Sequence, residues 1–236
     1  MTKFTPQELA SFSDKDSGRL EYRSLYEEND FITAYSAHTD KRIELDGPEL
    51  AIGAKKDGAQ DWDIHSQQQL DFLTSRGLRP YHTLLDFGCG TGRLASRAVP
   101  YLEKGNYTGV DISPKALECA AHYLRANNMI DKMPRLVLAG GQISAAGEKF
   151  DFIFSHSVFT HLPMEIIQDI FLDLSTMEFQ EYCFTYKERD AATRTGLKQY
   201  SYPPSFFISL AHNYGLKAER LDVEWPAGQK TMRVWK

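Results

Sequence analysis

Short apolar runs alternate with segments of helical periodicity from about residue 66 to the C-terminus. The apolar runs predict buried strands, and the periodic segments between them predict helices. Alternating strands and helices are typical of an α/β fold with a parallel sheet. The expected strands are 83–87, 106–111, 135–139, 152–154 and 178–187, followed by a closing hairpin of 216–224 and 231–235. The expected helices are 67–76, 94–102, 114–127, 164–174 and 204–214.

The residues before this pattern are polar and irregular. Aromatic and aliphatic residues at near-helical spacing predict a helix within Glu21 to Tyr35, and Gly53–Ala59 is expected to form a loop. Ser66, with Gln69 three residues later, predicts a capping box for the helix that begins at Gln67. We therefore divide the chain into an N-terminal segment, residues 1–65, and an α/β domain, residues 66–236.

Three glycines at every second position follow the first expected strand: Gly88, Gly90 and Gly92. A strand that turns through glycines into a helix leaves the first amide donors of that helix unpaired, and glycine lets a polar ligand approach the backbone. Dinucleotide-binding turns share this arrangement. Here, however, Arg93 stands where a third dinucleotide glycine would be. The turn predicts a small-ligand site of a related but different kind.

Two acids flank the turn. Asp111 ends the second strand about 20 residues beyond the glycines, where an acid can bind both hydroxyls of a ribose. Asp86 lies in the first strand beside the turn, where it would repel a pyrophosphate and attract an ammonium or sulfonium group. The pair indicates a nucleoside ligand with a positive charge, which S-adenosylmethionine fits.

The segments Leu84–Ala95, Tyr107–Ser113 and Lys149–Leu162 together resemble the class I S-adenosylmethionine-dependent methyltransferases. The resemblance implies a doubly wound, seven-stranded, mostly parallel Rossmann-like sheet with an N-terminal helical lid over the cofactor. It also implies S-adenosylmethionine as the cofactor and an oxygen or nitrogen of a small molecule as the methyl acceptor. The alternatives are a non-catalytic S-adenosylmethionine-binding protein, a methyltransferase for protein or RNA, and a nicotinamide-binding Rossmann domain.

Carried onto this sequence, the resemblance assigns cofactor contacts to the strand ends and their loops. In place of the acid that many relatives use for the adenine amine, Gln142 offers an amide. The aromatic face of Trp62 suits a sulfonium, although this residue could equally anchor the lid to the core. The candidate cofactor-binding residues are Trp62, Asp86, Gly88, Cys89, Gly90, Gly92, Arg93, Asp111, Ile112, Gly141, Gln142, Ser155 and His156.

The loop after the fourth strand emerges at the switch point of such a sheet, where the reactive methyl group would lie. His161 in this loop is the candidate catalytic residue, either as a general base or by orienting the acceptor. The alternative is a structural hydrogen bond that holds the loop. The polar stretch 188–202 is expected to be a long loop at the same edge, and the candidate substrate-binding residues are His161, Lys198, Tyr200 and Tyr202.

The composition of the chain indicates which classes of binding partner to expect. The 236 residues carry a net charge of −5 and no strong basic cluster, which disfavours a nucleic-acid acceptor. The three cysteines lack metal-ligand spacing, and two histidines without nearby carboxylates make a poor metal site. Without a signal pattern or a long apolar run, we expect a soluble, cytoplasmic protein that does not bind membranes. The identity of the acceptor and the oligomeric state stay open.

Overall fold

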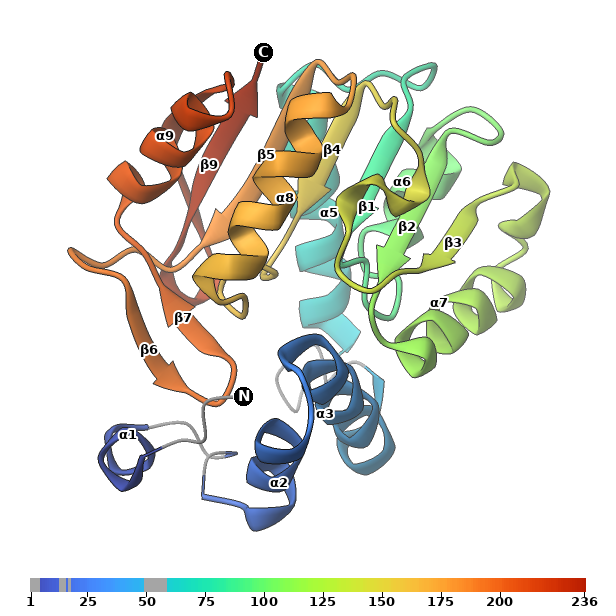
Figure 1. The fold of residues 1–236 in the computed structure, drawn as a ribbon. Coiled ribbons are helices and arrows are strands. Elements are labelled where there is room, and N and C mark those ends of the chain that lie inside the picture. Colours follow the sequence, from blue (N-terminus) through green and yellow to red (C-terminus); the bar gives the residue numbers. More distant parts are fainter. Residues whose placement is uncertain (1–4, 13–15, 17, 49–58) are drawn as a thin grey trace.

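The computed structural model describes residues 5–12, 16, 18–48 and 59–236. A seven-stranded sheet forms its centre, in the order β3-β2-β1-β4-β5-β9-β8 (Figure 1). The first five strands are parallel, whereas β9 runs antiparallel to both of its neighbours. The strands are β1 (Leu84–Phe87), β2 (Tyr107–Asp111), β3 (Arg135–Leu138), β4 (Phe152–Ser155), β5 (Glu181–Tyr186), β8 (Lys217–Trp225) and β9 (Gln229–Trp235). The expected seven-stranded, mostly parallel sheet is confirmed.

Helices cover both faces of the sheet. Leu85 and Ile153 pack with α8 and α9 on one face, whereas Leu84 and Phe154 pack with α5 and α6 on the other. Strands buried on both faces explain the continuous apolar runs in the sequence. The helices are α5 (Ala59–Ser75), α6 (Ala95–Tyr101), α7 (Pro114–Ala126), α8 (Met164–Thr176) and α9 (Pro204–Asn213), with short 3-10 turns η1 (Ile130–Lys132), η2 (Ile143–Ala146) and η3 (Pro226–Gly228).

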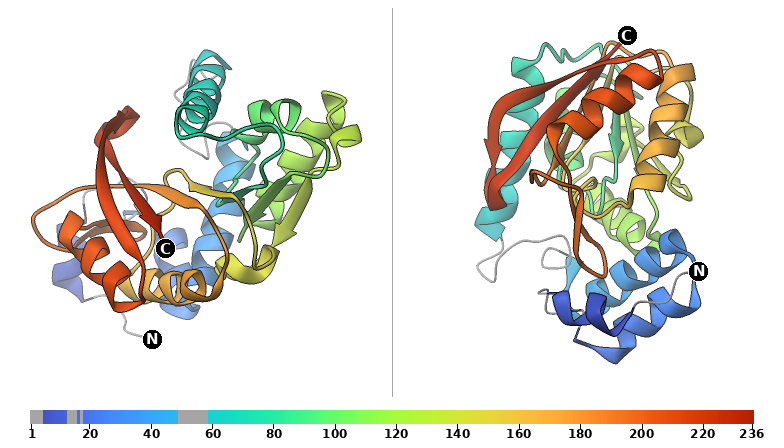
Figure 2. Two further views of the ribbon diagram at one scale, coloured as in Figure 1. Left: turned by 90° about the horizontal axis from the view of Figure 1, so that it is seen from above. Right: turned by 60° about the vertical axis from the view of Figure 1, so that its left-hand side comes forward.

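In the described part of the N-terminal segment, helices lie on the side of the sheet where the parallel strands have their carboxyl ends (Figures 1 and 2). They are α1 (Pro6–Ser11), α2 (Leu20–Glu28) and α3 (Phe31–Asp46). We call α2 and α3 the lid. Its buried residues Tyr22, Tyr26 and Ala34 form a small core together with Leu197, which comes from the stretch 188–202. The expected N-terminal helical lid is therefore present.

Local helix boundaries differ from the sequence-based expectation at two places. The segment predicted as one helix within Glu21 to Tyr35 forms two, because Asp30 caps α3 by accepting a hydrogen bond from the Thr33 amide at 3.1 Å. The capping box at Ser66 is wrong: Ser66 lies inside α5, where its hydroxyl donates to the Asp63 carbonyl at 2.9 Å. Helix α5 thus runs across the predicted domain boundary, while residues 53–58 of the predicted Gly53–Ala59 loop lie outside the described residues.

The stretch 188–202, predicted as a loop, contains a second sheet. Strands β6 (Thr193–Gly196) and β7 (Gln199–Ser201) form an antiparallel hairpin beside the lid. Hydrogen bonds fasten the hairpin to the loop after β4: the Tyr200 amide donates to the Thr160 carbonyl at 2.9 Å, and the Tyr202 hydroxyl to the Leu162 carbonyl at 2.8 Å. The sequence did not predict these strands because their residues are mostly polar. Three of the four residues of β6 are partly exposed to solvent, which polar side chains tolerate.

Candidate functional site

A cavity of about 520 Å³ lies at the carboxyl ends of the parallel strands. The loops after β1 and β4 meet there, and because chain connections leave these neighbouring strands in opposite directions, this is the switch point of the sheet. Lid and hairpin complete the walls. The lining residues are Asp16, Ile32, Tyr35, Thr39, Arg42, His65, Gln69, Asp86, Phe87, Gly88, Cys89, Gly90, Arg93, Leu94, Val110, Asp111, Ile112, Ala139, Gly141, His156, Ser157, Val158, Thr160, His161, Leu162, Ile166, Lys187, Lys198, Gln199, Ala227 and Gln229.

Two carboxylates line this cavity from neighbouring strands, since the pairing of β1 with β2 brings both to one edge of the sheet. One oxygen of Asp111 accepts a hydrogen bond from the Gly90 amide at 2.8 Å, and the other from the Ser113 amide at 2.9 Å. Each carboxylate oxygen has a second lone pair, so Asp111 can still accept hydrogen bonds from a ligand. Asp86 accepts one from the Tyr107 hydroxyl at 2.7 Å.

Burial makes both carboxylates costly to ionise. It raises the pKa of Asp86 to about 7, with a contribution from the charge of Asp111, although the Tyr107 hydrogen bond opposes the rise. Burial also raises the pKa of Asp111, against the backbone hydrogen bonds from Ser113 and Gly90. A bound positive charge would relieve this cost, because it favours the ionised carboxylates.

The glycine turn works partly through packing rather than through exposed amides. The amides of Gly88 and Cys89 both donate to the Val110 carbonyl, at 2.8 and 2.9 Å, and that of Gly90 donates to Asp111, so these amides of the turn are already paired within the protein. Gly88 has a φ of +81°, and a Cβ there would lie 2.2 Å from a methyl of Val158. Glycine is therefore required for the loops after β1 and β4 to meet.

Arg93 places a positive charge in the same cavity. Burial lowers its pKa to about 10, while the charge of Asp86 raises it, so the guanidinium stays charged near neutral pH. Its central carbon lies 5.8 Å from the ring centroid of Trp62, a cation–π distance. Trp62 is buried and does not line the cavity, so its contact with the site runs through Arg93.

A closed set of hydrogen bonds fixes the loop after β4. Ser157, at a φ of +61°, donates its amide proton to the Thr185 hydroxyl at 2.7 Å. That hydroxyl donates to the side-chain oxygen of Gln229 at 2.6 Å, and the Gln229 amide returns to the Ser157 hydroxyl at 2.5 Å. The bonds join β4, β5 and β9, which stabilises a backbone conformation that non-glycine residues rarely adopt.

Two histidines of this loop line the cavity in the neutral state. The ring of His156 lies edge-on to Trp225 with 4.9 Å between centroids, and burial lowers its pKa to about 3. Burial, reinforced by the charge of Lys198, lowers the pKa of His161 to about 3 as well. His161 Nδ1 lies 2.8 Å from the Lys198 carbonyl, which can only accept, so Nδ1 carries the proton and Nε2 is left as an acceptor.

The structure gathers most of the predicted site residues into this one cavity. The predicted residues that line it are Asp86, Gly88, Cys89, Gly90, Arg93, Asp111, Ile112, Gly141, His156, His161 and Lys198. Those that do not are Trp62, Gly92, Gln142, Ser155, Tyr200 and Tyr202.

The predicted residues that do not line the cavity make contacts elsewhere or face solvent. The Ser155 hydroxyl is buried 2.9 Å from that of Tyr182. Tyr200 and Tyr202 are buried and fix the hairpin, and a Cβ at Gly92 would lie 3.2 Å from Ala120 of α7. Gln142 is exposed at the start of η2. These side chains shape the site from behind, apart from Gln142, which faces solvent.

Sequence reasoning missed the contributions of the lid and of the antiparallel strands. Tyr35 lines the cavity from α3, and its ring centroid lies 5.6 Å from that of His161. Lys187 and Gln229 line it from the end of β5 and the start of β9. The aromatic spacing in α3 could have pointed to Tyr35, whereas no local pattern distinguishes Lys187 or Gln229 from other polar residues.

Across 5–12, 16, 18–48 and 59–236, no group of three or more histidine, cysteine, aspartate or glutamate side chains is placed to hold a metal ion. In the same part of the chain, no helix combines the length and the apolar character needed to span a bilayer.

Part of the chain matches a known domain family, and the whole fold resembles solved structures. Residues 85–176 match the family model described as a methyltransferase domain. A crystal structure of magnesium protoporphyrin IX methyltransferase from Synechocystis with bound S-adenosylhomocysteine shares the fold, with a TM-score of 0.67 at 15% identity over 88% of this chain and 100% of that one.

Two further structures agree. An S-adenosylmethionine-dependent methyltransferase from Clostridium acetobutylicum gives a TM-score of 0.56 at 16% identity, over 85% of this chain and 98% of that one. A protein from Pyrococcus horikoshii gives 0.59 at 11% identity, over 83% and 98%. The region that matches the methyltransferase-domain model contains the glycine turn, Asp111 and the loop after β4, and the chain shares the Rossmann-like fold of these methyltransferase structures.

Proposed function

We propose that this protein transfers the methyl group of S-adenosylmethionine to an oxygen or nitrogen of a small-molecule acceptor bound in the same cavity. The observation that carries the proposal is a pair of carboxylates in one cavity, the buried Asp86 and the half-buried Asp111, together with the cationic Arg93. The amino-acid group of S-adenosylmethionine carries an ammonium and a carboxylate. Asp86 offers a negative charge to the ammonium, and Arg93 offers a positive charge to the carboxylate. Asp111 occupies the position from which an acid binds ribose hydroxyls.

The donor set fits the cofactor, because burial raises the pKa of Asp86 to about 7 even beside Arg93, and a bound sulfonium or ammonium would favour the ionised carboxylate. When bound, S-adenosylmethionine supplies an activated methyl group whose sulfonium charge disappears as the methyl leaves. The chain contributes alignment and exclusion of water. Alignment of two reactants can lower a barrier by about 7–11 kcal/mol, which exceeds what a single base contributes.

His161 is assigned to acceptor orientation. With its proton fixed on Nδ1 by the Lys198 carbonyl, the neutral ring presents Nε2 as a hydrogen-bond acceptor. A hydroxyl or amine of the acceptor can donate to this nitrogen, which turns a lone pair of the nucleophile toward the methyl group. The low pKa of His161, about 3, makes it a weak base, so orientation is the larger part of its role.

Calorimetric titration with S-adenosylhomocysteine tests the cofactor assignment. We expect the wild-type protein to bind it and Asp111→Ala to lose at least tenfold in affinity, since two ribose hydroxyls lose their acceptor. Asp131→Ala, in the exposed turn η1, is the matched control and should bind normally. Failure of the wild type to bind, combined with binding of NAD, would return the chain to the nicotinamide alternative. Binding without methyl transfer to any acceptor would favour the non-catalytic one.

A further inference from the structure

The cavity extends past the cofactor residues to the side of β1 on which β4, β5 and β9 lie. Asp111, Ile112 and Gly141 line it at the carboxyl ends of β2 and β3 and in the loops that follow them. Ser157 and Gln229 line it from the loop after β4 and from the start of β9, on the other side of β1. This second part of the cavity is the space left for a methyl acceptor, and we call it the acceptor half.

The hydrogen-bond ring of Ser157, Thr185 and Gln229 has a fixed direction. The Ser157 amide can only donate, so the Thr185 oxygen accepts at 2.7 Å, and the Thr185 proton goes to the side-chain oxygen of Gln229 at 2.6 Å. The Gln229 nitrogen can likewise only donate, so the Ser157 hydroxyl oxygen accepts at 2.5 Å. The opposite orientation of the Gln229 amide would leave the proton of the fully buried Thr185 without an acceptor in the ring.

This direction leaves the proton of the Ser157 hydroxyl for the cavity. In the chain as far as the structure describes it, no group accepts a hydrogen bond from that hydroxyl, and Ser157 lines the cavity. Gln229 has an exposed fraction of only 6% but lines the cavity as well, and its amide has a second proton. Two donor atoms therefore lie 2.5 Å apart in the wall of the acceptor half. Adjacent donors suit the lone pairs of an oxygen atom.

Ser157 and His161 belong to one turn, whose hydrogen bonds fix them relative to each other. The Thr160 hydroxyl donates to the Ser157 carbonyl at 3.1 Å. The His161 amide donates to the Val158 carbonyl at 2.9 Å. Nε2 of His161 is an acceptor, whereas the Ser157 hydroxyl is a donor. The turn thus offers an acceptor for the proton of a nucleophile and a donor for an oxygen atom of the same molecule.

We propose that the methyl acceptor carries a carbonyl-type oxygen next to its nucleophilic hydroxyl or amine, and that the Ser157 hydroxyl binds this oxygen. Ketone, amide and carboxylate groups share this chemistry. Ser157 is a substrate-binding residue, whereas Thr185 is a positioning residue that acts through it, because Thr185 is buried outside the cavity lining. The inference rests on the proposed function, since it assigns the substrate class of the same cavity.

The test uses two uncharged probes of nearly the same shape on the protein saturated with S-adenosylhomocysteine. Acetophenone carries a carbonyl oxygen, and α-methylstyrene has a CH2 group in its place. Ligand-observed NMR measures both affinities for the wild type and for each variant. The difference in hydration between the two probes cancels when each variant is compared with the wild type. Benzoate, as a third probe, distinguishes a carboxylate from a neutral carbonyl.

Ser157→Gly removes the hydroxyl and keeps the turn, because glycine adopts a φ of +61° freely. We expect this variant to weaken binding of acetophenone about three- to tenfold, as the loss of one hydrogen bond, and to leave α-methylstyrene unchanged. Its midpoint of urea unfolding should stay close to that of the wild type. Ser157→Ala should show the same selectivity between the probes.

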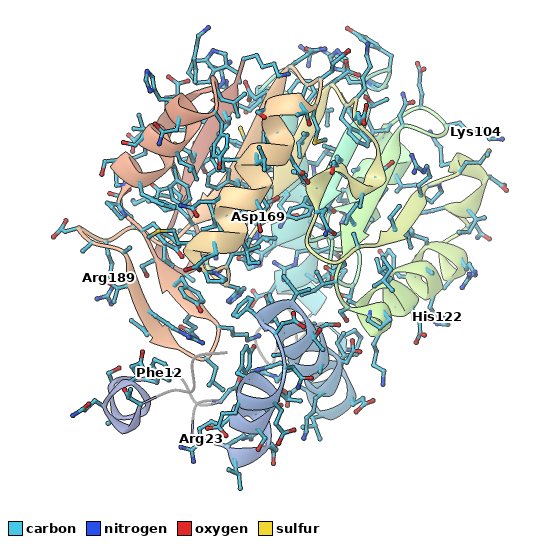
Figure 3. The ribbon with its side chains drawn as sticks, in the orientation of Figure 1. Phe12, Arg23, Lys104, His122, Asp169 and Arg189 are labelled. Atoms are coloured by element: carbon cyan, nitrogen blue, oxygen red, sulfur yellow. The ribbon has the colours of Figure 1, made fainter. Side chains whose placement is uncertain are left out.

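Thr185→Val tests the positioning role, because valine has the shape of threonine but can neither accept from the Ser157 amide nor donate to Gln229. Acetophenone should weaken as in Ser157→Gly, whereas Thr185→Ser, which keeps the hydroxyl, should bind it like the wild type. The matched control is Ser175→Ala at the C-terminal end of α8, away from the lid (Figures 1 and 3). The Ser175 hydroxyl donates to the Leu172 carbonyl of the same helix at 2.6 Å, and its loss should change no affinity.

The outcomes separate this inference from the proposed function. If the wild type does not bind S-adenosylhomocysteine, both are overturned. If it binds, only the carbonyl-binding role is overturned when Ser157→Gly weakens acetophenone and α-methylstyrene equally or not at all. The same holds when neither acetophenone nor benzoate binds the wild type at about 10 mM. A selective loss of benzoate alone supports the inference and identifies the oxygen as that of a carboxylate.

Two further results concern single residues. If Ser157→Gly weakens S-adenosylhomocysteine as much as acetophenone, Ser157 serves the cofactor and the inference is wrong. If Thr185→Val keeps the selectivity of the wild type, or Thr185→Ser does not restore it, the positioning role of Thr185 is wrong.

Discussion

The protonation state of Asp86 depends on whether a positively charged ligand is bound in the cavity. Its buried carboxyl has a pKa raised to about 7, mainly by burial. A raised pKa in the folded state means that this carboxyl stabilises the ligand-free protein at low pH and that its contribution is lost as the pH rises through about 7. A positive ligand reverses the preference, because it binds the ionised form.

We therefore expect S-adenosylmethionine to bind about tenfold more tightly at pH 7.0 than at pH 5.5, since one pKa unit corresponds to about 1.4 kcal/mol. Asp86→Asn should remove most of this dependence and lower the affinity at neutral pH. Titration calorimetry at both pH values measures the change, and proton release is seen by repeating it in buffers of different ionisation enthalpy. An affinity that stays level in the wild type would contradict the assignment.

His161 combines a structural hydrogen bond with a free acceptor nitrogen. Asparagine can keep a donor near the position of Nδ1 but has no group at the position of Nε2, whereas alanine lacks both. We expect His161→Ala to lose about 1 kcal/mol of unfolding free energy and His161→Asn to lose less, because the bond to the Lys198 carbonyl is kept.

Both variants should lose methyl transfer by a similar factor, measured as S-adenosylhomocysteine formed once an acceptor is available. Unchanged turnover in His161→Ala would remove the orienting role and leave only the structural one. A loss in alanine that asparagine restores would also place the effect in the fixed turn, not in Nε2.

At the scale of elements, the lid is held to the sheet by a few polar contacts next to the cofactor residues. The Ser36 hydroxyl of α3 donates to the Ile112 carbonyl at 2.8 Å, directly after Asp111. Asp40, one turn further along α3, accepts from the Ser113 hydroxyl at 2.5 Å. Ile32 packs over Gly141, since a Cβ there would lie 3.1 Å from its methyl. A ligand that fills the cavity has to pass this lid or lie beneath it.

Ser36→Ala should make S-adenosylhomocysteine dissociate about two- to tenfold faster, because one hydrogen bond of the closed lid contributes about 0.5–1.5 kcal/mol. Stopped-flow displacement measures the rate, and hydrogen exchange of residues 31–46 should increase in parallel. The matched control is Ser24→Ala in α2, whose hydroxyl bonds only within its own helix, to the Leu20 carbonyl. Equal rates for Ser36→Ala and the wild type would show that the contact does not retain the ligand.

At the scale of the whole molecule, one buried acid joins a helix to two strands. The carboxylate of Glu181 accepts hydrogen bonds from Arg76 at 2.7 and 2.8 Å and from Arg233 at 2.6 Å. Burial raises the pKa of Glu181, but the hydrogen bonds and charges of the two arginines outweigh it, and the pKa is lowered overall. This carboxylate joins the residue after α5 to β5 and β9.

Glu181→Gln should lower the unfolding free energy by about 2 kcal/mol, less than for a fully buried pair because both arginines are 28% exposed. The folded-state pKa is lowered, so this stability is present above the ordinary glutamate pKa and is lost as the pH falls through the folded value. Urea unfolding between pH 3 and 7 should show a smaller acid loss in the variant. Glu219→Gln, which removes a more exposed partner of Arg233, should cost under about 1 kcal/mol.

The sequence by itself determined the β1–turn–α6–β2 unit and the two acids at its strand ends. These features are local, because a strand, a glycine turn, a helix and a second parallel strand can be joined in essentially one handedness. The positions of Asp86 and Asp111 at one edge of the sheet follow directly. The seven-stranded, mostly parallel sheet was implied by the resemblance to class I methyltransferases, whereas the order of its strands came from the structure.

Only the tertiary structure decided which side chains complete the cavity. Tyr35, Lys187 and Gln229 come from α3 and from the ends of β5 and β9, far apart in sequence, and the packing of these elements brings them to one space. Packing likewise buries Trp62, Tyr200 and Tyr202 away from the cavity lining. Burial of a large aromatic ring in the core is more favourable in free energy than its contact with a polar cavity. The spacing of residues along the chain predicts where strands end. The direction of a side chain depends instead on packing against residues that are distant in the sequence.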